Sequence, residues 1–291
     1  MKIIYRYLGV ICTSFTIISC GTSKYVSQSP DTPVVPFFKE KGEGKVSVGG
    51  LWNGSSNKVG LTTQAAYAIT KNIAATISYN TQHDKEKRTV DWDFIFPSQS
   101  GDIGRFYKRK NFSIGGGYFK LIGPKQNKSL NLYGGLGFGT VDVRENDITL
   151  NNQGQPQTFK MPEHSNKVIR YYLHPSYSIM PGKVFRANFG ARLTLAHLNS
   201  FTSNLPEDEL DRRGWPLKSK TLFCLEPSVN IQINMAPEVA FETGFTLNVT
   251  PRIPESTRVM TDNYNPNNMN ASRGIIFYTR LTFNLIKRSD K

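Results

Sequence analysis

Two patterns in the sequence predict an all-β fold, an antiparallel up-and-down transmembrane β-barrel of about ten strands. Apolar and polar residues alternate with a period of two from Lys45 onward, which places every second side chain on one face of a strand. Short and long connections also alternate along the chain. A membrane barrel accounts for both patterns, because its strands face lipid on one side, its periplasmic turns are short and its extracellular loops are long.

Composition agrees with this fold class. The chain has 291 residues, of which 38% are hydrophobic and 20% charged, so it is neither disordered throughout nor too short for a large domain. A mean hydropathy of −0.39 argues against a bundle of membrane-spanning helices. A membrane barrel keeps such a value because only half of its strand side chains meet lipid.

The amino terminus predicts export from the cytoplasm. Residues 1–19 form a signal peptide, in which Lys2 and Arg6 precede an uncharged stretch too short to span a bilayer comfortably as a helix. Residues 17–21, Ile-Ile-Ser-Cys-Gly, resemble a bacterial lipobox, which implies cleavage before Cys20 and attachment of lipid, palmitate included, to that residue. Ordinary signal-peptide cleavage is the alternative. Residues 20–44 are rich in Ser, Pro, Lys and Gly and predict a lipid-anchored flexible tether.

Ten strands follow in order, at residues 45–52, 59–69, 73–79, 111–121, 130–138, 169–179, 185–195, 223–235, 239–249 and 275–285. Short turns are predicted at residues 70–72, 123–127, 181–182 and 236–238. Long loops are predicted at residues 83–104, 142–165, 200–218 and 251–273, while the first connection, 53–57, is short. An even number of strands brings the amino and carboxyl termini of the barrel to the same side, the side of the short turns.

The last strand, with Phe277, Leu281 and Phe283, resembles the carboxy-terminal signal of outer-membrane barrels, although a basic tail of residues 287–291 follows it. Residues 45–286 as a whole resemble the small outer-membrane β-barrel families of diderm bacteria, in a lipoprotein variant. The resemblance implies a location in the bacterial outer membrane, lipid-anchored and with a periplasmic amino terminus. A soluble lipocalin-like barrel or β-sandwich on a lipid anchor is the alternative, which the loop asymmetry disfavours.

The charge distribution predicts a polar lumen. Without Lys2 and Arg6 the chain keeps 34 basic and 22 acidic residues, a net charge of +12. The faces assigned to the lumen carry a charge cluster, with Lys45, Lys58 and Lys220 beside it. The cluster comprises Arg170, Arg186, Arg192, Glu226, Glu242 and Arg280.

Glu226 and Glu242 are expected to pair with Arg192 and Arg280, because an isolated buried charge is costly. A ten-stranded barrel is only slightly wider than one that side chains fill, so we expect a filled lumen. An open lumen with this surplus of positive charge would favour anions.

His174 and Ser176 are the candidate catalytic residues. Their spacing resembles the His-x-Ser pair of outer-membrane lipid A deacylases, in which His activates a Ser nucleophile. The alternation turns both side chains inward, away from lipid. A second grouping, His83 and Asp84 with Asp91 and Asp93, is faintly similar to the site of omptin-type proteases.

The expected function is a structural or interaction subunit of a cell-envelope assembly, without enzyme activity. Expected partners are outer-membrane lipids, which the basic short turns would meet, and envelope proteins at the turns or long loops. The dispersed positive charge disfavours nucleic acid. No cofactor or metal is predicted, since neither zinc-ligand spacing nor a Gly-rich phosphate loop is present. A narrow anion-preferring pore and a lipid A-modifying enzyme that uses His174 and Ser176 are the alternatives.

Overall fold

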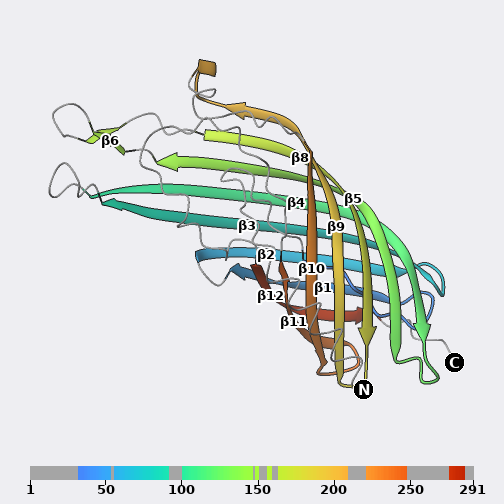
Figure 1. Cartoon of the computed structure of the whole chain (residues 1–291). Coiled ribbons are helices and arrows are strands. Elements are labelled where there is room, and N and C mark those ends of the chain that lie inside the picture. The colour runs from blue at the N-terminus through green and yellow to red at the C-terminus, as the bar shows by residue number, and fades with distance from the viewer. Residues whose placement is uncertain are drawn as a thin grey trace, which may run out of the picture.

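The structure is a computed structural model, and ten of its strands close into one antiparallel barrel (Figure 1). Neighbouring strands pair around the barrel in the order β1-β12-β11-β10-β9-β8-β5-β4-β3-β2, so β1 closes the sheet against β12. The predicted fold class and number of barrel strands are confirmed. The described residues are 32–53, 56–91, 100–146, 148–150, 156–158, 163–208, 221–247 and 275–285.

The barrel strands are β1 (Gly44–Asn53), β2 (Ser56–Ala68), β3 (Ile73–Asp91), β4 (Ser100–Ile122), β5 (Lys128–Asn146), β8 (Glu163–Ile179), β9 (Phe185–Ser203), β10 (Thr221–Asn234), β11 (Val239–Leu247) and β12 (Ile275–Leu285). A separate two-stranded sheet, β6 (Ile148–Leu150) with β7 (Pro156–Thr158), lies in the connection between β5 and β8. The predicted signal peptide, Cys20 and the basic tail lie outside the described residues.

The short turns lie where the sequence predicts them. The turns from β2 to β3 and from β4 to β5 are two of them and lie at the same end of the barrel. In the turn between β4 and β5, Gly123 has a φ of 84° and Gln126 a φ of 48°. Glycine adopts this left-handed backbone without steric penalty, which explains a Gly at the start of the turn.

Several strands continue into segments that the sequence predicts as loops. Pairing of β3 with β4 extends to Asp91 opposite Ser100, inside the predicted loop 83–104. The apolar alternation ends before the strands do, because cross-strand hydrogen bonds between backbones do not depend on an apolar face. At 23 residues β4 spans roughly 75 Å, against about 30 Å of hydrocarbon. One wall of the barrel therefore extends past the shorter strands, as β3, β4 and β5 do in Figure 1.

Residues 32–38 differ most from the prediction. The sequence predicts them as part of a flexible tether, but Thr32, Val35, Phe37 and Phe38 are all buried, and Phe38 has no exposed surface. Phe38 packs in a cluster with Ala66, Ala68, Ala74, Phe119 and Tyr133, which belong to the inner faces of β2 to β5. The physical reason is the apolar run Val34-Val35-Pro36-Phe37-Phe38, because removing its side chains from water lowers the free energy of the folded chain. We name residues 32–38 the lumen segment.

Candidate functional site

The outer surface of the barrel is apolar. Large hydrophobic side chains project outward from all ten barrel strands and are 36–68% exposed, among them Val48, Leu61, Ile77, Ile114, Leu132, Leu173, Phe189, Leu195, Ile231, Phe241 and Leu281. Polar side chains take the alternate positions and are buried in the interior, the reverse of a soluble protein. Among described residues, no helix is long and apolar enough to cross a bilayer.

Aromatic residues border this apolar surface. Phe185 and Phe283 are each 40% exposed at the short-turn end. On the outward face near the opposite end, Trp52 stacks on Phe277 with ring centroids 6.4 Å apart, and Phe245 lies 6.3 Å from Phe277. A closed barrel has no unpaired strand edge, and an apolar belt between aromatic girdles matches a bilayer. The chain is therefore a transmembrane β-barrel of the outer-membrane type.

The candidate site in the interior consists of the lumen segment and the charged side chains around it. The lumen segment runs from Thr32, deep in the barrel, to Phe38 near the short turns. Gln64 Nε2 donates hydrogen bonds to Thr32 O at 2.9 Å and to Thr32 Oγ1 at 2.6 Å. Thr32 Oγ1 also lies 2.9 Å from Thr62 Oγ1. These contacts fix the inner end of the segment against β2.

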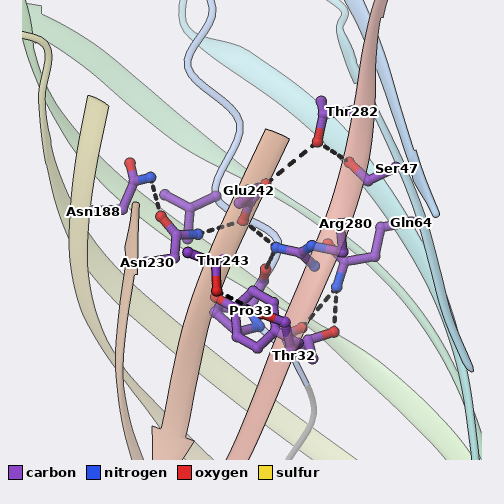
Figure 2. Close-up of polar contacts among 12 residues, drawn as sticks. Thr32, Pro33, Ser47, Gln64, Asn188, Asn230, Glu242, Thr243, Arg280 and Thr282 are labelled. Carbon is purple, nitrogen blue, oxygen red and sulfur yellow. Dashed lines mark hydrogen bonds and ion pairs between the residues drawn. The ribbon is translucent and has the colours of Figure 1, made fainter. Parts of the chain in front are cut away.

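Two lumen arginines hold the middle of the segment. Arg280 Nη2 donates to Pro33 O at 3.3 Å, and Arg186 Nη2 donates to Val35 O at 3.3 Å. The Arg186 guanidinium lies 5.9 Å from the centroid of the Phe37 ring. Barrel strands far away in the sequence, β9 and β12, therefore bind the backbone carbonyls of the segment (Figure 2 shows the contact between Arg280 and Pro33).

Glu242 lies at the centre of a polar network on the inner faces of β9 to β12 and β1 (Figure 2). It forms an ion pair with Arg280, its direct cross-strand neighbour. Glu242 Oε1 also accepts from Asn230 Nδ2 at 2.5 Å, and Asn230 in turn accepts from Asn188. Glu242 Oε2 accepts from Thr282 Oγ1 at 3.4 Å. All of these residues are buried.

The other predicted pair, Arg192 with Glu226, also lies directly across neighbouring strands. Arg192 Nε is 3.9 Å from Glu226 Oε2, and Thr194 Oγ1 donates to the same oxygen at 3.3 Å. The Arg192 guanidinium stacks over the Tyr172 ring, 4.8 Å from its centroid. Each carboxylate of the predicted cluster is thus beside the arginine expected from the sequence.

The structure places the remaining predicted residues as follows. Arg170 is buried on the inner face of β8, and Lys45 is partly buried at the inner start of β1. The side chain of Lys58 and the whole of Lys220 lie outside the described part of the chain. The side chains of Asp84 and Asp91 are likewise outside it, as is Asp93, while His83 is exposed on β3.

His174 and Ser176 are both buried on the inner face of β8, at 1% and 7% exposure. Ser176 Oγ accepts a hydrogen bond from Asn131 Nδ2 at 3.3 Å. The His174 ring packs against Gly190 on β9, where a Cβ atom would clash with the ring at 2.5 Å from Nε2. The pair thus faces the lumen, as the alternation predicts, and not the lipid. The described residues contain no group of three or more acidic, His or Cys side chains able to hold a metal ion.

Sequence reasoning missed two parts of the interior. Arg109, which lies between the predicted loop 83–104 and the predicted strand 111–121, is 3% exposed on the inner face of β4, with its guanidinium 4.9 Å from the centroid of the Tyr107 ring. The lumen segment was the second omission. Its signal was the apolar run of residues 34–38 inside an otherwise polar stretch.

No protein-family model and no curated protein sequence matches the chain. Among solved structures, the outer membrane protease OmpT from Escherichia coli matches with a TM-score of 0.43 and 11% identity, over 86% of this chain and 97% of that one. The attachment invasion locus protein Ail of Yersinia pestis matches with a TM-score of 0.29 and 10% identity, over 84% and 97%. The NanC porin matches with a TM-score of 0.31 and 8% identity, over 82% and 98%. At these TM-scores no function is transferred.

Proposed function

We propose that the chain is a plugged, lipid-anchored outer-membrane barrel that serves as a structural or interaction subunit of a cell-envelope assembly. The observation that carries the proposal is the lumen segment, which occupies the interior and is bound there by Gln64, Arg186 and Arg280. A barrel whose lumen is filled by its own chain is suited to hold a position in the membrane and to present its ends to partners. Its basic short turns support contact with anionic phospholipid headgroups.

Copurification from intact outer membranes tests this role. A short amine-reactive crosslinker, applied before detergent extraction, should join the chain to one or a few defined envelope proteins through lysines of its turns, such as Lys125 and Lys183, both exposed. Substitution of both lysines by Gln should remove the adducts formed through these two turns while leaving the folded barrel intact on cold gels. A chain recovered without any adduct under these conditions would contradict the role as a subunit.

Lipid attachment at Cys20 is tested by labelling with radioactive palmitate. The parent chain should incorporate label, whereas Cys20→Ala should not, and Cys224→Ala should label as the parent does because Cys224 is buried inside the barrel. Equal labelling of parent and Cys20→Ala would contradict the lipobox interpretation.

The direction of the lumen segment bears on the side of the membrane where Cys20 lies. Thr32 lies deeper in the barrel than Phe38, so the preceding chain joins the segment at its inner end. Eleven residues separate Cys20 from Thr32 and reach at most about 40 Å. An epitope placed directly after Cys20 should become accessible only when the outer membrane is permeabilised if the amino terminus is periplasmic. Detection on intact cells would instead place Cys20 at the cell surface.

An anion-preferring pore is the second candidate, supported by the arginines of the lumen. Conduction would require the lumen segment to leave the barrel. The parent chain should then show no conductance in planar bilayers, whereas a chain without residues 32–38 should conduct anions in preference to cations. Conductance of the parent equal to that of the deletion would contradict a plugged barrel.

We propose no catalytic role for His174 and Ser176, because their burial in the lumen keeps them from a lipid substrate on the outer surface. Ser176→Ala should leave lipid A in the host membrane unchanged, as judged by mass spectrometry. Loss of a lipid A modification in this variant, with the barrel still folded on cold gels, would overturn the proposal.

A further inference from the structure

The charges around a small cavity beside the lumen segment do not balance. The cavity is lined by Val34, Val35 and Pro36 on one side and by the inner faces of β1, β2, β9, β11 and β12 on the other. Its charged lining consists of Lys45, Arg186, Arg280 and Glu242, three cationic groups against one carboxylate. The remaining lining is apolar or carries hydroxyl and amide groups, namely Ser47, Gln64, Ala65, Ala66 and Thr282.

The single carboxylate is already engaged. Both oxygens of Glu242 accept hydrogen bonds, Oε1 from Arg280 and Asn230 and Oε2 from Thr282. Its charge compensates that of Arg280, its ion-pair partner. Glu43, the carboxylate nearest to Lys45 in the sequence, accepts from Lys39 N at 2.9 Å and does not line the cavity. Arg186 and Lys45 form no ion pair with the one carboxylate of the lining, so three cationic groups share it.

Donors of the two arginines also lack acceptors. Arg186 is 4% exposed and Arg280 is 2% exposed. Within the described part of the chain, no acceptor lies in hydrogen-bond range of Arg186 Nε, Arg280 Nε or Arg280 Nη1. The carbonyls of Pro33 and Val35 take up only one nitrogen of each guanidinium. A buried charged donor without an acceptor is strongly destabilising, so these donors favour binding of an acceptor. The excess of cationic groups in the lining favours an acceptor with negative charge.

We propose that this cavity binds a small inorganic anion of chloride size, held by the guanidinium groups of Arg186 and Arg280 and the ammonium group of Lys45. The cavity is small and is lined on one side by the lumen segment, which suits an ion of this size. Bound there, the anion compensates one surplus charge and links β9, β12 and the lumen segment. This site goes beyond the proposed structural role and does not depend on the identity of any partner.

Unfolding in two salts tests the proposal on the purified full chain in detergent. The folded fraction is measured on cold gels along a urea series, in sodium chloride and in sodium gluconate at equal ionic strength, so that charge screening is the same. Gluconate is too large for the cavity. Chloride should lower the apparent unfolding equilibrium constant by the factor 1 + [Cl⁻]/Kd, about elevenfold at ten times Kd. Equal unfolding in the two salts would overturn the proposal.

A pair of matched variants assigns the effect to the cavity. Arg186→Gln should abolish the difference between chloride and gluconate. Arg170→Gln removes an arginine that is equally buried, at 3% exposure, but does not line the cavity, so it should keep the difference. A chloride effect that persists in Arg186→Gln would overturn the assignment.

Crystals of the unmodified chain soaked in sodium bromide give a readout that does not depend on the folding of any variant. An anomalous peak should lie between Arg186, Arg280 and Lys45. Absence of a peak in the cavity at a bromide concentration that reproduces the chloride effect would overturn the proposal.

Discussion

Truncation of Phe38 to alanine should release the lumen segment while leaving the barrel folded. Phe38 has no exposed surface and lies 5.7 Å, centroid to centroid, from Phe119, with Lys45 Nζ 5.7 Å from its ring centroid. Loss of a fully buried Phe side chain costs about 3–5 kcal/mol, and the cation–π contact adds about 0.5–1 kcal/mol. The substitution should weaken the free energy of docking of the segment and not that of barrel folding, because residues 32–38 form no part of any barrel strand.

Cysteine accessibility measures this release. A Val35→Cys substitution puts a reporter at a position that is 7% exposed in the docked segment. Since each 1.4 kcal/mol is a factor of ten, loss of about 3 kcal/mol or more raises the undocked fraction at least roughly 100-fold. The rate of maleimide labelling should rise by the same factor where docking is fast compared with labelling. Subtracting the labelling of the same chain without the reporter removes the background from other thiols.

The matched control is Phe189→Ala, which truncates a Phe that is 48% exposed on the outer face of β9. It should leave labelling at Val35→Cys unchanged. Cold gels should show a folded, heat-modifiable band for both variants. A labelling rate in Phe38→Ala within threefold of the parent rate would refute the conclusion that Phe38 holds the segment in the lumen.

Three further pairs of matched substitutions test the barrel itself through urea titration in lipid vesicles. Gly49→Ala should destabilise the barrel by about 1–3 kcal/mol, because its Cβ would lie 2.6 Å from Arg280 Cα, where β1 pairs with β12. Gly50→Ala is the control and should be nearly neutral, because its Cβ would meet no atom closer than 3.9 Å. Glu242→Gln should cost about 3–5 kcal/mol by leaving buried arginine charge uncompensated. By contrast, Glu163→Gln breaks an exposed pair and should cost at most about 1 kcal/mol. Leu132→Arg should cost about 2–4 kcal/mol, and Leu130→Arg, which lies nearer the short turn and so nearer the membrane interface, should cost less. Equal costs would contradict this difference in membrane depth.

Much of the lumen chemistry follows from the sequence because strand alternation is a local property. In β12, for example, Ile276, Tyr278, Arg280 and Thr282 are buried whereas Leu281 and Phe283 are exposed. Within the bilayer, knowing which residues occupy one strand is enough to assign each side chain to lumen or lipid. The sequence could also predict the pairing of Glu226 with Arg192, because few basic residues face the lumen and could pair with a carboxylate there.

The ends of the strands were less predictable. The apolar pattern stops where the strand leaves lipid, as at Tyr79 on β3, but the strand continues to Asp91. Beyond the bilayer the outer face of the sheet no longer meets lipid, so no outward hydrophobic period marks the continuing backbone pairing. The extent of the projecting wall therefore depends on hydrogen bonds between partner strands, as in the 19 residue pairs that join β3 and β4 from Ile73↔Tyr118 to Asp91↔Ser100.

The sequence by itself determined the class of the fold, the number of barrel strands and the side of the sheet that each strand residue faces. Only the tertiary structure decided that residues 32–38 enter the lumen, and that the carbonyl of Pro33 accepts from Arg280, 247 positions away. A contact of that kind leaves no period in the sequence, because it depends on closure of the barrel, which brings the inner faces of β9 and β12 around one enclosed space. The excess of cationic groups beside Glu242 arises from the same closure.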